Sequence, residues 1–247
     1  MARAAVLGRL VLTPIRWQLC DVAELIDETP QVKTIILDAP DWPGHRAGQH
    51  VDVRLTAEDG YQAQRSYSIA SAPEDELLAI TVEKLDDGEV SPYLAEELRV
   101  GDKLELRGPI GGYFVWDAQQ GGPLLLVGGG SGVVPLVSML RHRAAVAPSV
   151  PARLLYSARS LDDVIYRAEL DGFDVVYTLT REQPAGWTGF ARRVDDAMLR
   201  EVADPNAEGL AYVCGPTRFV EAVADGLVGV GYAPENVRTE RFGPTGG

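Results

Sequence analysis

Residues 124–135, with the sequence Leu-Leu-Leu-Val-Gly-Gly-Gly-Ser-Gly-Val-Val-Pro, constrain the fold more than any other part of the chain. The first four form a short apolar run, as expected of a parallel strand that is buried on both faces. The next five are glycines and one serine, so the backbone can turn sharply and approach a ligand closely. Helical spacing resumes at Val133, and Pro135 suits a first helical turn. A helix N-terminus after such a turn can bind an anion.

The glycine turn matches none of three better-known motifs. Val133 stands where the third glycine of Gly-x-Gly-x-x-Gly would be, and the Gly-Lys-Ser/Thr ending of a phosphate loop is missing. A Gly-x-Ser-x-Gly nucleophile elbow centred on Ser131 also fails at Val133, and the only later histidine, His142, lies in the same expected helix. The turn by itself therefore leaves two interpretations open, an anion site and a plain tight connection.

The first half of the chain shows short alternating segments, which we expect to be strands. They lie at residues 17–26, 32–37, 50–55, 65–70, 77–83 and 103–107, and Asp, Gly and Pro clusters separate them. Six strands at this spacing predict a six-stranded antiparallel β-barrel. One short helix is expected after Ser91, because a serine followed by Pro92 is typical of an N-cap and a first helical position.

The second half shows strands that alternate with helices. Strands are expected at residues 124–127, 153–157, 175–180, 211–214 and 237–240, with helices at 133–147, 162–170, 194–202 and 217–228. This order predicts an α/β doubly wound parallel sheet, which binds ligands beyond the carboxyl ends of its strands. We therefore expect a leader at 1–16, a barrel domain at 17–118 and an α/β domain at 123–247.

Charge and cysteine content narrow the function classes. The formal net charge of −13 argues against nucleic acid and anionic membrane surfaces as partners of the whole chain. Cys20 and Cys214 form neither a disulfide framework nor iron–sulfur spacing, which indicates a reducing cytoplasm. The three histidines are scattered and predict no metal site. No apolar run reaches the roughly 20 residues that a membrane span needs.

Four motifs, in this order on the expected elements, resemble the ferredoxin-NADP reductase family of flavoproteins. They are Arg65-Ser66-Tyr67-Ser68 in the barrel, Gly88-Glu89-Val90-Ser91 before its helix, the glycine turn, and Cys214-Gly215-Pro216 at a later strand end. The resemblance spans residues 17–242. It implies an FAD-binding barrel followed by an NAD(P)-binding domain.

The barrel motifs supply the expected flavin contacts. The guanidinium of Arg65 can bind a pyrophosphate with two hydrogen bonds, and Tyr67 shares its strand face, so the Tyr67 ring can lie along a flavin. The alternative is a surface charge and a barrel-wall aromatic. The resemblance implies that Ser68 hydrogen-bonds flavin N5 or O4. It also implies that the helix start aims its positive end at the flavin diphosphate, through Gly88, Glu89, Val90 and Ser91. A plain N-cap remains the alternative for Ser91.

The α/β motifs supply the expected nucleotide contacts. The pyrophosphate would lie on Gly129, Gly130, Ser131, Gly132 and Val133. Arg159 stands at the end of one expected strand and Arg181, after Thr180, at the end of the next, and neither strand end carries a carboxylate. Because a 2′-phosphate binds arginine whereas the ribose of NAD binds an acidic residue, they favour NADPH. Two surface arginines are the alternative.

The resemblance implies two further site residues. Cys214, followed by Gly215, would lie beside nicotinamide C4, where we expect it to position the ring rather than to act as a nucleophile. Phe242 is expected to shield the flavin, although the sequence continues past it where plant-type members end in an aromatic residue.

The function predicted is that of a cytoplasmic flavoprotein oxidoreductase. Hydride passes from NADPH to FAD, and single electrons then pass to a separate acceptor, by resemblance a ferredoxin. FAD is preferred to FMN because the helix start at Ser91 suits a diphosphate. Two alternatives stay open, a free flavin reductase or NADH-dependent reductase without a protein partner, and a non-catalytic subunit that binds flavin or nucleotide.

Overall fold

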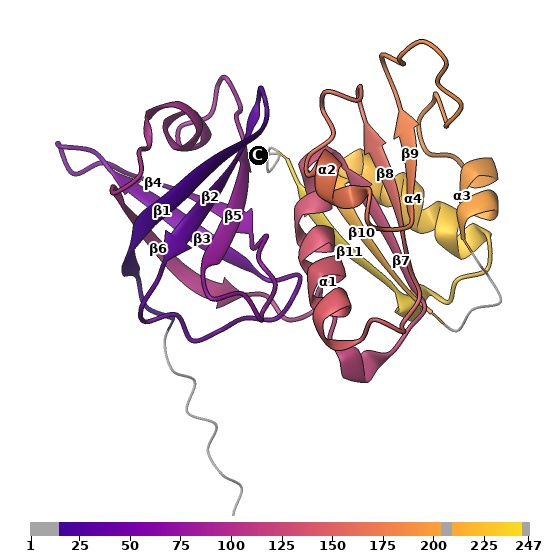
Figure 1. The fold of residues 1–247 in the computed structure, drawn as a ribbon, viewed down its shortest axis with the longest axis horizontal. Coiled ribbons are helices and arrows are strands. Elements are labelled where there is room, and N and C mark those ends of the chain that lie inside the picture. The colour runs from indigo at the N-terminus through magenta and orange to yellow at the C-terminus, as the bar shows by residue number, and fades with distance from the viewer. Residues whose placement is uncertain (1–14, 204–208, 244–247) are drawn as a thin grey trace, which may run out of the picture.

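The computed structural model describes residues 15–203 and 209–243, whose strands form two sheets side by side (Figure 1). One sheet is six-stranded and antiparallel, and the other is five-stranded and parallel. This is the predicted combination of a barrel and a doubly wound sheet. Of the expected leader at 1–16, residues 1–14 lie outside the described residues, so that prediction is not tested.

The antiparallel sheet has the strand order β4-β3-β6-β1-β2-β5. Ile69 directly follows β4, and Ile80 lies in β5. An antiparallel bridge between these two residues joins the two edge strands and closes the sheet into a barrel. All six predicted strands are present, with longer bounds in most cases. They are β1 (Gln18–Thr29), β2 (Val32–Asp38), β3 (His50–Thr56), β4 (Gln62–Ser68), β5 (Leu78–Glu83) and β6 (Lys103–Ile110).

Alternating side chains fill the barrel. In β6, Leu104 and Leu106 are buried while their neighbours Lys103 and Glu105 are more accessible, as a half-buried strand requires. The inward residues of the other strands join the same cluster, including Cys20, Ile35, Leu37, Val51, Val53, Ile80 and Val82. One side of each strand therefore packs inside the barrel and leaves the other side for solvent or for the second sheet.

The helical turn after β5 differs from the prediction in how it begins. Helical geometry starts at Ser91 itself, and the following turn, η1 (Tyr93–Glu97), is a π-helix without a side-chain cap. The Ser91 hydroxyl instead accepts a hydrogen bond of 3.1 Å from the amide of Leu85. The N-cap role predicted for Ser91 is therefore wrong, because the folded-back loop from residue 85 gives this buried hydroxyl another partner.

The parallel sheet has the strand order β11-β10-β7-β8-β9. Its strands are β7 (Leu124–Gly129), β8 (Ala152–Ala158), β9 (Val175–Leu179), β10 (Leu210–Pro216) and β11 (Val237–Phe242). The long helices are α1 (Val133–Val146) and α4 (Thr217–Gly229), with the shorter α2 (Arg167–Leu170) and α3 (Asp196–Val202). Residues of α1 and α2 pack on one face of the sheet and those of α3 and α4 on the other.

Helix α2 is much shorter than the predicted helix at 162–170. Tyr166 has a φ of 59°, a left-handed conformation that a continuous helix cannot contain. The hydroxyl of Tyr166 hydrogen-bonds Thr81 of β5, and the Ser160 hydroxyl donates to Asp163 at 2.6 Å. The segment therefore gives up helical turns in order to place a buried tyrosine against the barrel.

Helix α1 lies between the barrel and the parallel sheet (Figure 1). The Ser138 hydroxyl donates to the carbonyl of Ser71 at 2.7 Å, and Arg141 donates to the carbonyl of Ala70 at 2.7 Å. Arg141 also binds Glu169 through two hydrogen bonds of 2.8 and 2.6 Å. These contacts hold the two sheets together on the side of α1.

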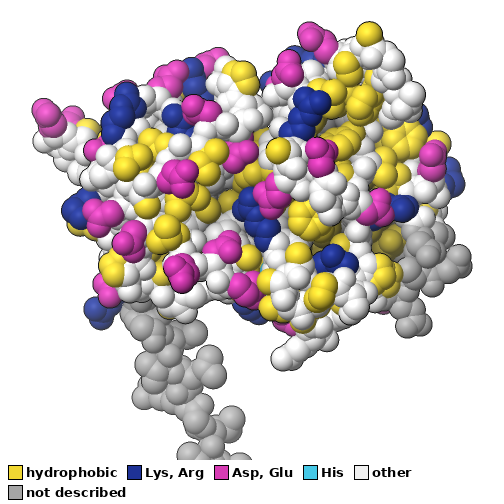
Figure 2. Space-filling model, in the orientation of Figure 1, with side chains coloured by type: hydrophobic (Ala, Val, Ile, Leu, Met, Phe, Trp, Pro, Cys, Tyr) yellow, Lys and Arg dark blue, Asp and Glu magenta, His cyan; other side chains and the backbone are white. Residues whose placement is uncertain are grey.

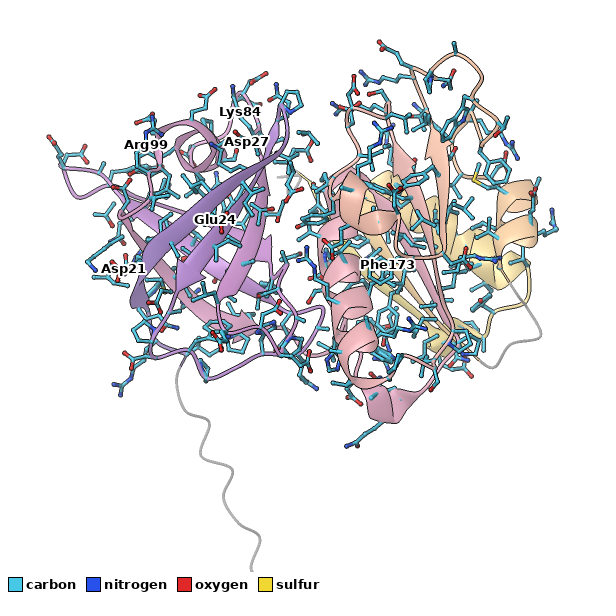
Figure 3. All side chains as sticks on the ribbon, viewed as in Figure 1. Asp21, Glu24, Asp27, Lys84, Arg99 and Phe173 are labelled. Carbon is cyan, nitrogen blue, oxygen red and sulfur yellow. The ribbon has the colours of Figure 1, made fainter. Side chains whose placement is uncertain are left out.

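The acidic side chains of the chain are concentrated on the barrel. Between residues 17 and 118 there are 21 Asp and Glu against 8 Lys and Arg, a net charge of −13 for this part alone. Figure 2 shows acidic side chains spread over the barrel, and Asp21, Glu24 and Asp27 follow one another along β1 (Figure 3). The barrel surface thus repels polyanions and attracts basic partners.

Candidate functional site

The motif at residues 65–68 lies at the end of β4. Arg65 and Tyr67 are opposite Val53 and Val51 of β3, so they share one strand face, and Tyr67 packs against the barrel core. Burial raises the pKa of the Tyr67 hydroxyl, while the Arg65 charge opposes this shift. The Arg65 side chain is 52% exposed, which leaves its guanidinium accessible to a ligand.

The two serines of this motif lie on the opposite face of β4. Ser66 donates to Asp52 at 2.6 Å, and Asp52 also forms an ion pair of 2.9 Å with Arg107. Ser68 is opposite His50 in the β3–β4 pairing. Ser66 is therefore engaged in a barrel contact, whereas Ser68 reaches the end of the strand.

The structure brings the two barrel motifs into direct contact. Arg65 donates to Glu89 at 2.7 Å, and the Tyr61 hydroxyl donates to the other Glu89 oxygen at 2.8 Å. The hydrogen bonds from Tyr61 and from Arg65 lower the pKa of Glu89. Among the described residues, the amides of Glu89 and Val90 donate to no protein group. A guanidinium and free amides therefore lie at the same place.

The glycine turn packs backbone against backbone. A Cβ atom on Gly132 would lie 2.3 Å from the carbonyl oxygen of Cys214 in β10, so only glycine fits there. Gly130 has a φ of +55°, and residues Gly130–Gly132 form a 3-10 turn between β7 and α1. Gly129 approaches the ring of Phe219, the third residue of α4, with 2.9 Å to a built Cβ. The turn thus leaves backbone groups at the carboxyl edge of the sheet.

Ser131 connects this turn to the barrel. Its hydroxyl donates to Glu83, the last residue of β5, at 2.7 Å. Glu83 carries no sequence signal as a site residue, because nothing in the order of residues says which barrel strand would face the turn. The hydrogen bond places the glycine turn directly beside the barrel.

Cys214 lies in β10, which pairs with β7 on one side and with β11 on the other. It is opposite Gly128 of β7 and Glu240 of β11, and it is 2% exposed. Burial, with a further contribution from the Glu240 charge, raises the pKa of the Cys214 thiol well above its usual value. A thiol that stays protonated is a poor nucleophile. Its neighbour Gly215 lies against Phe219, 2.8 Å from a built Cβ.

The contact between Glu240 and His50 likewise has no signal in the sequence. One carboxylate oxygen, Oε1, lies 3.6 Å from Nδ1 of His50 across the boundary between the two sheets. The other, Oε2, is buried and has no hydrogen-bond partner among the described residues. The sequence places Glu240 on the last strand, but only the folded register sets it beside Cys214 and His50.

Arg159 and Arg181 lie together beyond the ends of β8 and β9. The Arg181 amide donates to the Arg159 carbonyl at 2.9 Å, and Thr180 donates to the Ala158 carbonyl through both its amide and its hydroxyl. Both arginines are exposed, and neither forms an ion pair within the described part of the chain. By contrast, nearby Arg192 is paired with Asp195 at 2.6 Å.

Phe242 ends β11 opposite Pro216, at the carboxyl end of β10, and its side chain is exposed. Residues 244–247 lie outside the described range. In the described ranges, no group of three or more His, Cys, Asp and Glu is arranged to hold a metal ion. None of the helices in those ranges has the length and the apolar character of a membrane span.

Two family models match the chain, one on each sheet. Residues 27–115 match an oxidoreductase FAD-binding domain, and residues 126–225 match an oxidoreductase NAD-binding domain. The chain is 33% identical over 234 residues to the glycine betaine monooxygenase reductase subunit of Chromohalobacter salexigens, with 90% of this chain and 63% of the relative covered. The chain thus spans less than two thirds of that relative.

The match to a second relative covers a larger share of that relative. The aromatic O-demethylase reductase subunit of an Amycolatopsis species is 30% identical over 247 residues, which cover 95% of this chain and 72% of the relative. The chain belongs to the ferredoxin-NADP reductase family. The crystal structure of a Neisseria gonorrhoeae ferredoxin-NADP⁺ reductase shares this family fold, with a TM-score of 0.78 at 20% identity over 91% of this chain and 98% of that chain.

The residues present fit the FAD and the nicotinamide nucleotide that the two family domains imply. Family membership gives an FAD-binding and an NAD-binding domain. On the barrel, an accessible guanidinium and free amides suit a diphosphate. On the parallel sheet, Gly132 leaves no room for a side chain, and a buried oxygen of Glu240 has no hydrogen-bond donor among the described residues.

Proposed function

We propose that the chain is an NADPH-dependent flavoprotein reductase that passes electrons to a separate acceptor. Residues 17–118 form its FAD-binding barrel and residues 123–247 its NADPH-binding domain. The observation that carries the proposal is the meeting of two motifs, where Arg65 lies 2.7 Å from Glu89 at the start of a helical turn. This contact collects the phosphate-binding groups of the barrel in one place.

On the barrel, Arg65 and the amides of Glu89, Val90 and Ser91 bind the FAD diphosphate, whereas the Gly88 amide already donates to the Leu85 carbonyl at 2.9 Å. Tyr67 supports the flavin ring from the strand face it shares with Arg65, and Ser66 fixes β4 through Asp52. Ser68, at the strand end, offers a hydroxyl to the flavin edge. We further propose that Phe242 covers the flavin from the end of β11.

On the parallel sheet, the turn from Gly129 to Val133 binds the nucleotide pyrophosphate through backbone amides at the start of α1. Arg159, which follows β8, and Thr180 and Arg181, which follow β9, bind the 2′-phosphate of NADPH. Support comes from the exposure of both arginines and from the lack of an ion pair within the described residues, which leaves both guanidinium groups accessible to a phosphate.

Three residues lie where the two cofactor rings would meet. Cys214 has a protonated thiol at the sheet edge, Gly215 packs against Phe219, and the Glu240 carboxylate lies opposite Cys214. These groups orient the nicotinamide, exclude water and supply hydrogen-bond acceptors. A bound flavin would accept the hydride of NADPH and release electrons one at a time.

The acceptor is proposed to be a separate protein, and a ferredoxin is the first candidate. Support comes from the two relatives named above, which are reductase subunits of oxygenase and demethylase systems. The acidic barrel surface favours an acceptor with a basic contact region. Two free cysteines agree with a cytoplasmic location.

The test begins with the visible spectrum of the purified protein after FAD or FMN has been added. Bleaching of the flavin by NADPH and by NADH is then followed in a stopped-flow instrument, with and without a ferredoxin as acceptor. We expect FAD to be retained and NADPH to bleach it faster than NADH does. Transfer only to free flavin would point to a free flavin reductase, and a colourless protein that oxidises no nucleotide would refute the proposal.

A further inference from the structure

A histidine and a glutamate approach each other across the boundary between the two sheets. His50 is the first residue of β3 in the barrel, and Glu240 lies in β11 of the parallel sheet. The distance from His50 Nδ1 to Glu240 Oε1 is 3.6 Å, and each side chain is about a quarter exposed. This is the distance of an ion pair rather than of a hydrogen bond, so the charge on His50 governs the contact.

The second carboxylate oxygen of Glu240 is buried on the strand next to Cys214, near the sheet edge where the nicotinamide is proposed to bind. Oε2 is buried without a hydrogen-bond partner among the described residues, and Glu240 is opposite Cys214 in the sheet. A buried carboxylate oxygen without a donor costs free energy, so a positively polarised group is favoured next to it. Within the described part of the chain, no hydrogen-bond donor lies next to Oε2.

The other charged groups near His50 are already occupied or lie to one side. Asp52, two residues along β3, is bound by Arg107. Gly111 lies beside the His50 ring, since a Cβ built on it would be 3.5 Å from His50 Nδ1. The Arg46 guanidinium lies one residue further on, with its Nη2 at 3.5 Å from a Cβ built on Gly112. On the strands packed against His50, Ser68 and Ile110 are uncharged. The Glu240 carboxylate is therefore the charge that responds most directly to His50.

The two redox states of a nicotinamide differ in charge at the ring. The oxidised ring is a cation and the reduced ring is neutral. With a neutral His50, the Glu240 carboxylate leaves a negative charge at this place, which favours the oxidised ring. With a protonated His50, the pair is neutral and this preference is reduced. Histidine is the side chain whose charge ordinarily changes between about pH 5 and 8.

We propose that His50 is a positioning residue that acts through Glu240 to set the relative affinity for oxidised and reduced nucleotide. The inference rests on the proposed function, because it requires a nicotinamide at the ends of β10 and β11. It assigns to the barrel a part in nucleotide binding, through a side chain that does not touch the phosphate-binding turn.

The test measures binding to the oxidised FAD-loaded protein without turnover. NADP⁺ and a 1,4,5,6-tetrahydronicotinamide analogue, which has a neutral ring and donates no hydride, are titrated at about pH 6 and about pH 8.5. In the wild type we expect the affinity ratio of NADP⁺ to the analogue to rise about fivefold with pH. In His50→Gln the ratio should stay at its high-pH value throughout.

The matched control is His142→Gln. His142 also pairs with a glutamate, Glu74 at 2.8 Å, but it lies in the last part of α1 and not on a strand. This variant should keep the wild-type pH dependence, and Glu240→Gln should lose it. A wild-type ratio that does not change with pH, or an unchanged slope in His50→Gln, would overturn the inference while leaving the reductase proposal intact. A protein that binds FAD but neither nucleotide would overturn both.

Discussion

Arg65 and Glu89, 24 positions apart in the sequence, form an ion pair with an Nη2–Oε2 distance of 2.7 Å. The pair joins the end of β4 to the segment before η1, the two places that carry the barrel motifs. Both side chains are about half exposed, so the pair itself contributes little to stability. Its significance lies in the position of the guanidinium.

Replacing Arg65 with alanine should abolish FAD retention while leaving the protein folded. The loss of a bidentate phosphate ligand should weaken FAD binding by at least tenfold, and Arg65→Lys should restore only part of it. Because this ion pair is about half exposed, its loss should change the free energy of unfolding little. Flavin content after gel filtration and a urea titration check both points.

Arg153 supplies the matched control for this experiment. Arg153 pairs with Asp174 at 2.9 Å and is exposed to a similar degree, but it lies in the other sheet. Arg153→Ala should keep its flavin. Full FAD retention in Arg65→Ala would remove Arg65 from the flavin site.

Replacing Arg159 or Arg181 with alanine should change nucleotide preference without loss of flavin. Each arginine that binds the 2′-phosphate should contribute about tenfold to the preference of kcat/KM for NADPH over NADH. Stopped-flow bleaching with both nucleotides measures this ratio. Arg192→Ala, which removes an arginine held by Asp195, is the control. If the ratio in both variants equals that of the wild type, NADPH specificity lies elsewhere.

Gly132→Ala should damage the glycine turn. The added Cβ would lie 2.3 Å from the Cys214 carbonyl oxygen, so backbone must move, and we expect a loss of about 2 kcal/mol in stability together with weaker nucleotide binding. Gly229→Ala, at the end of α4 with nothing near the new Cβ, should be neutral. A Gly132→Ala protein with wild-type stability and nucleotide affinity would show that the close packing is not required.

The protein should lose stability at alkaline pH. Burial raises the pKa of Cys20 from 9.0 to about 12 and the pKa of Tyr166 from 10.0 to about 12. The folded state therefore keeps protons that the unfolded chain releases, so the stabilisation is complete below about pH 9 and is lost as pH rises towards 12. Urea midpoints from about pH 8 to 11 measure the trend.

Cys20→Ala removes one of the groups responsible. Its midpoint should fall less steeply with pH than that of the wild type, although the variant starts from a lower stability because a buried side chain is truncated. A wild-type midpoint that stays constant over this range would contradict the buried, protonated state of these groups.

Arg141→Ala should weaken the contact between the two sheets. It leaves Glu169 and the Ala70 carbonyl without their donor, and since Arg141 and Glu169 are about a quarter to a third exposed, we expect a loss of about 2 kcal/mol. Thermal unfolding should broaden or split into two steps. Lys103→Ala, which removes an exposed pair with Asp21, should unfold like the wild type, and the same behaviour in Arg141→Ala would count against the coupling.

Local patterns were sufficient to predict the elements of the fold. The apolar run before the glycine turn became β7, and the alternating barrel segments became β1 to β6. What failed depended on contacts distant in the sequence. The Ser91 hydroxyl binds the Leu85 amide instead of capping a helix, and Tyr166 leaves the helical conformation to reach Thr81.

Some candidate site residues could be named from the sequence. Arg65, the glycine turn and Cys214 each have a local signature, and their roles stay predictions. Glu83 and Glu240 have no such signature, since their partners Ser131 and His50 come from the other sheet. Register between strands and contact between domains arise only in the folded chain, so no spacing in the sequence could indicate these pairs.

Helix α1 begins at the turn proposed for the nucleotide and contacts the barrel along its length, through Ser138 and Arg141. The two halves are therefore poor candidates for shuffling at the 118–123 link alone. A chimera that takes its barrel from one reductase and its parallel sheet from another would inherit mismatched surfaces on this helix. Exchange of coenzyme preference between relatives is better attempted by replacing only the residues directly after β8 and β9, around Arg159 and Arg181, and by keeping Tyr166 and Glu169, which contact Arg141 of that helix.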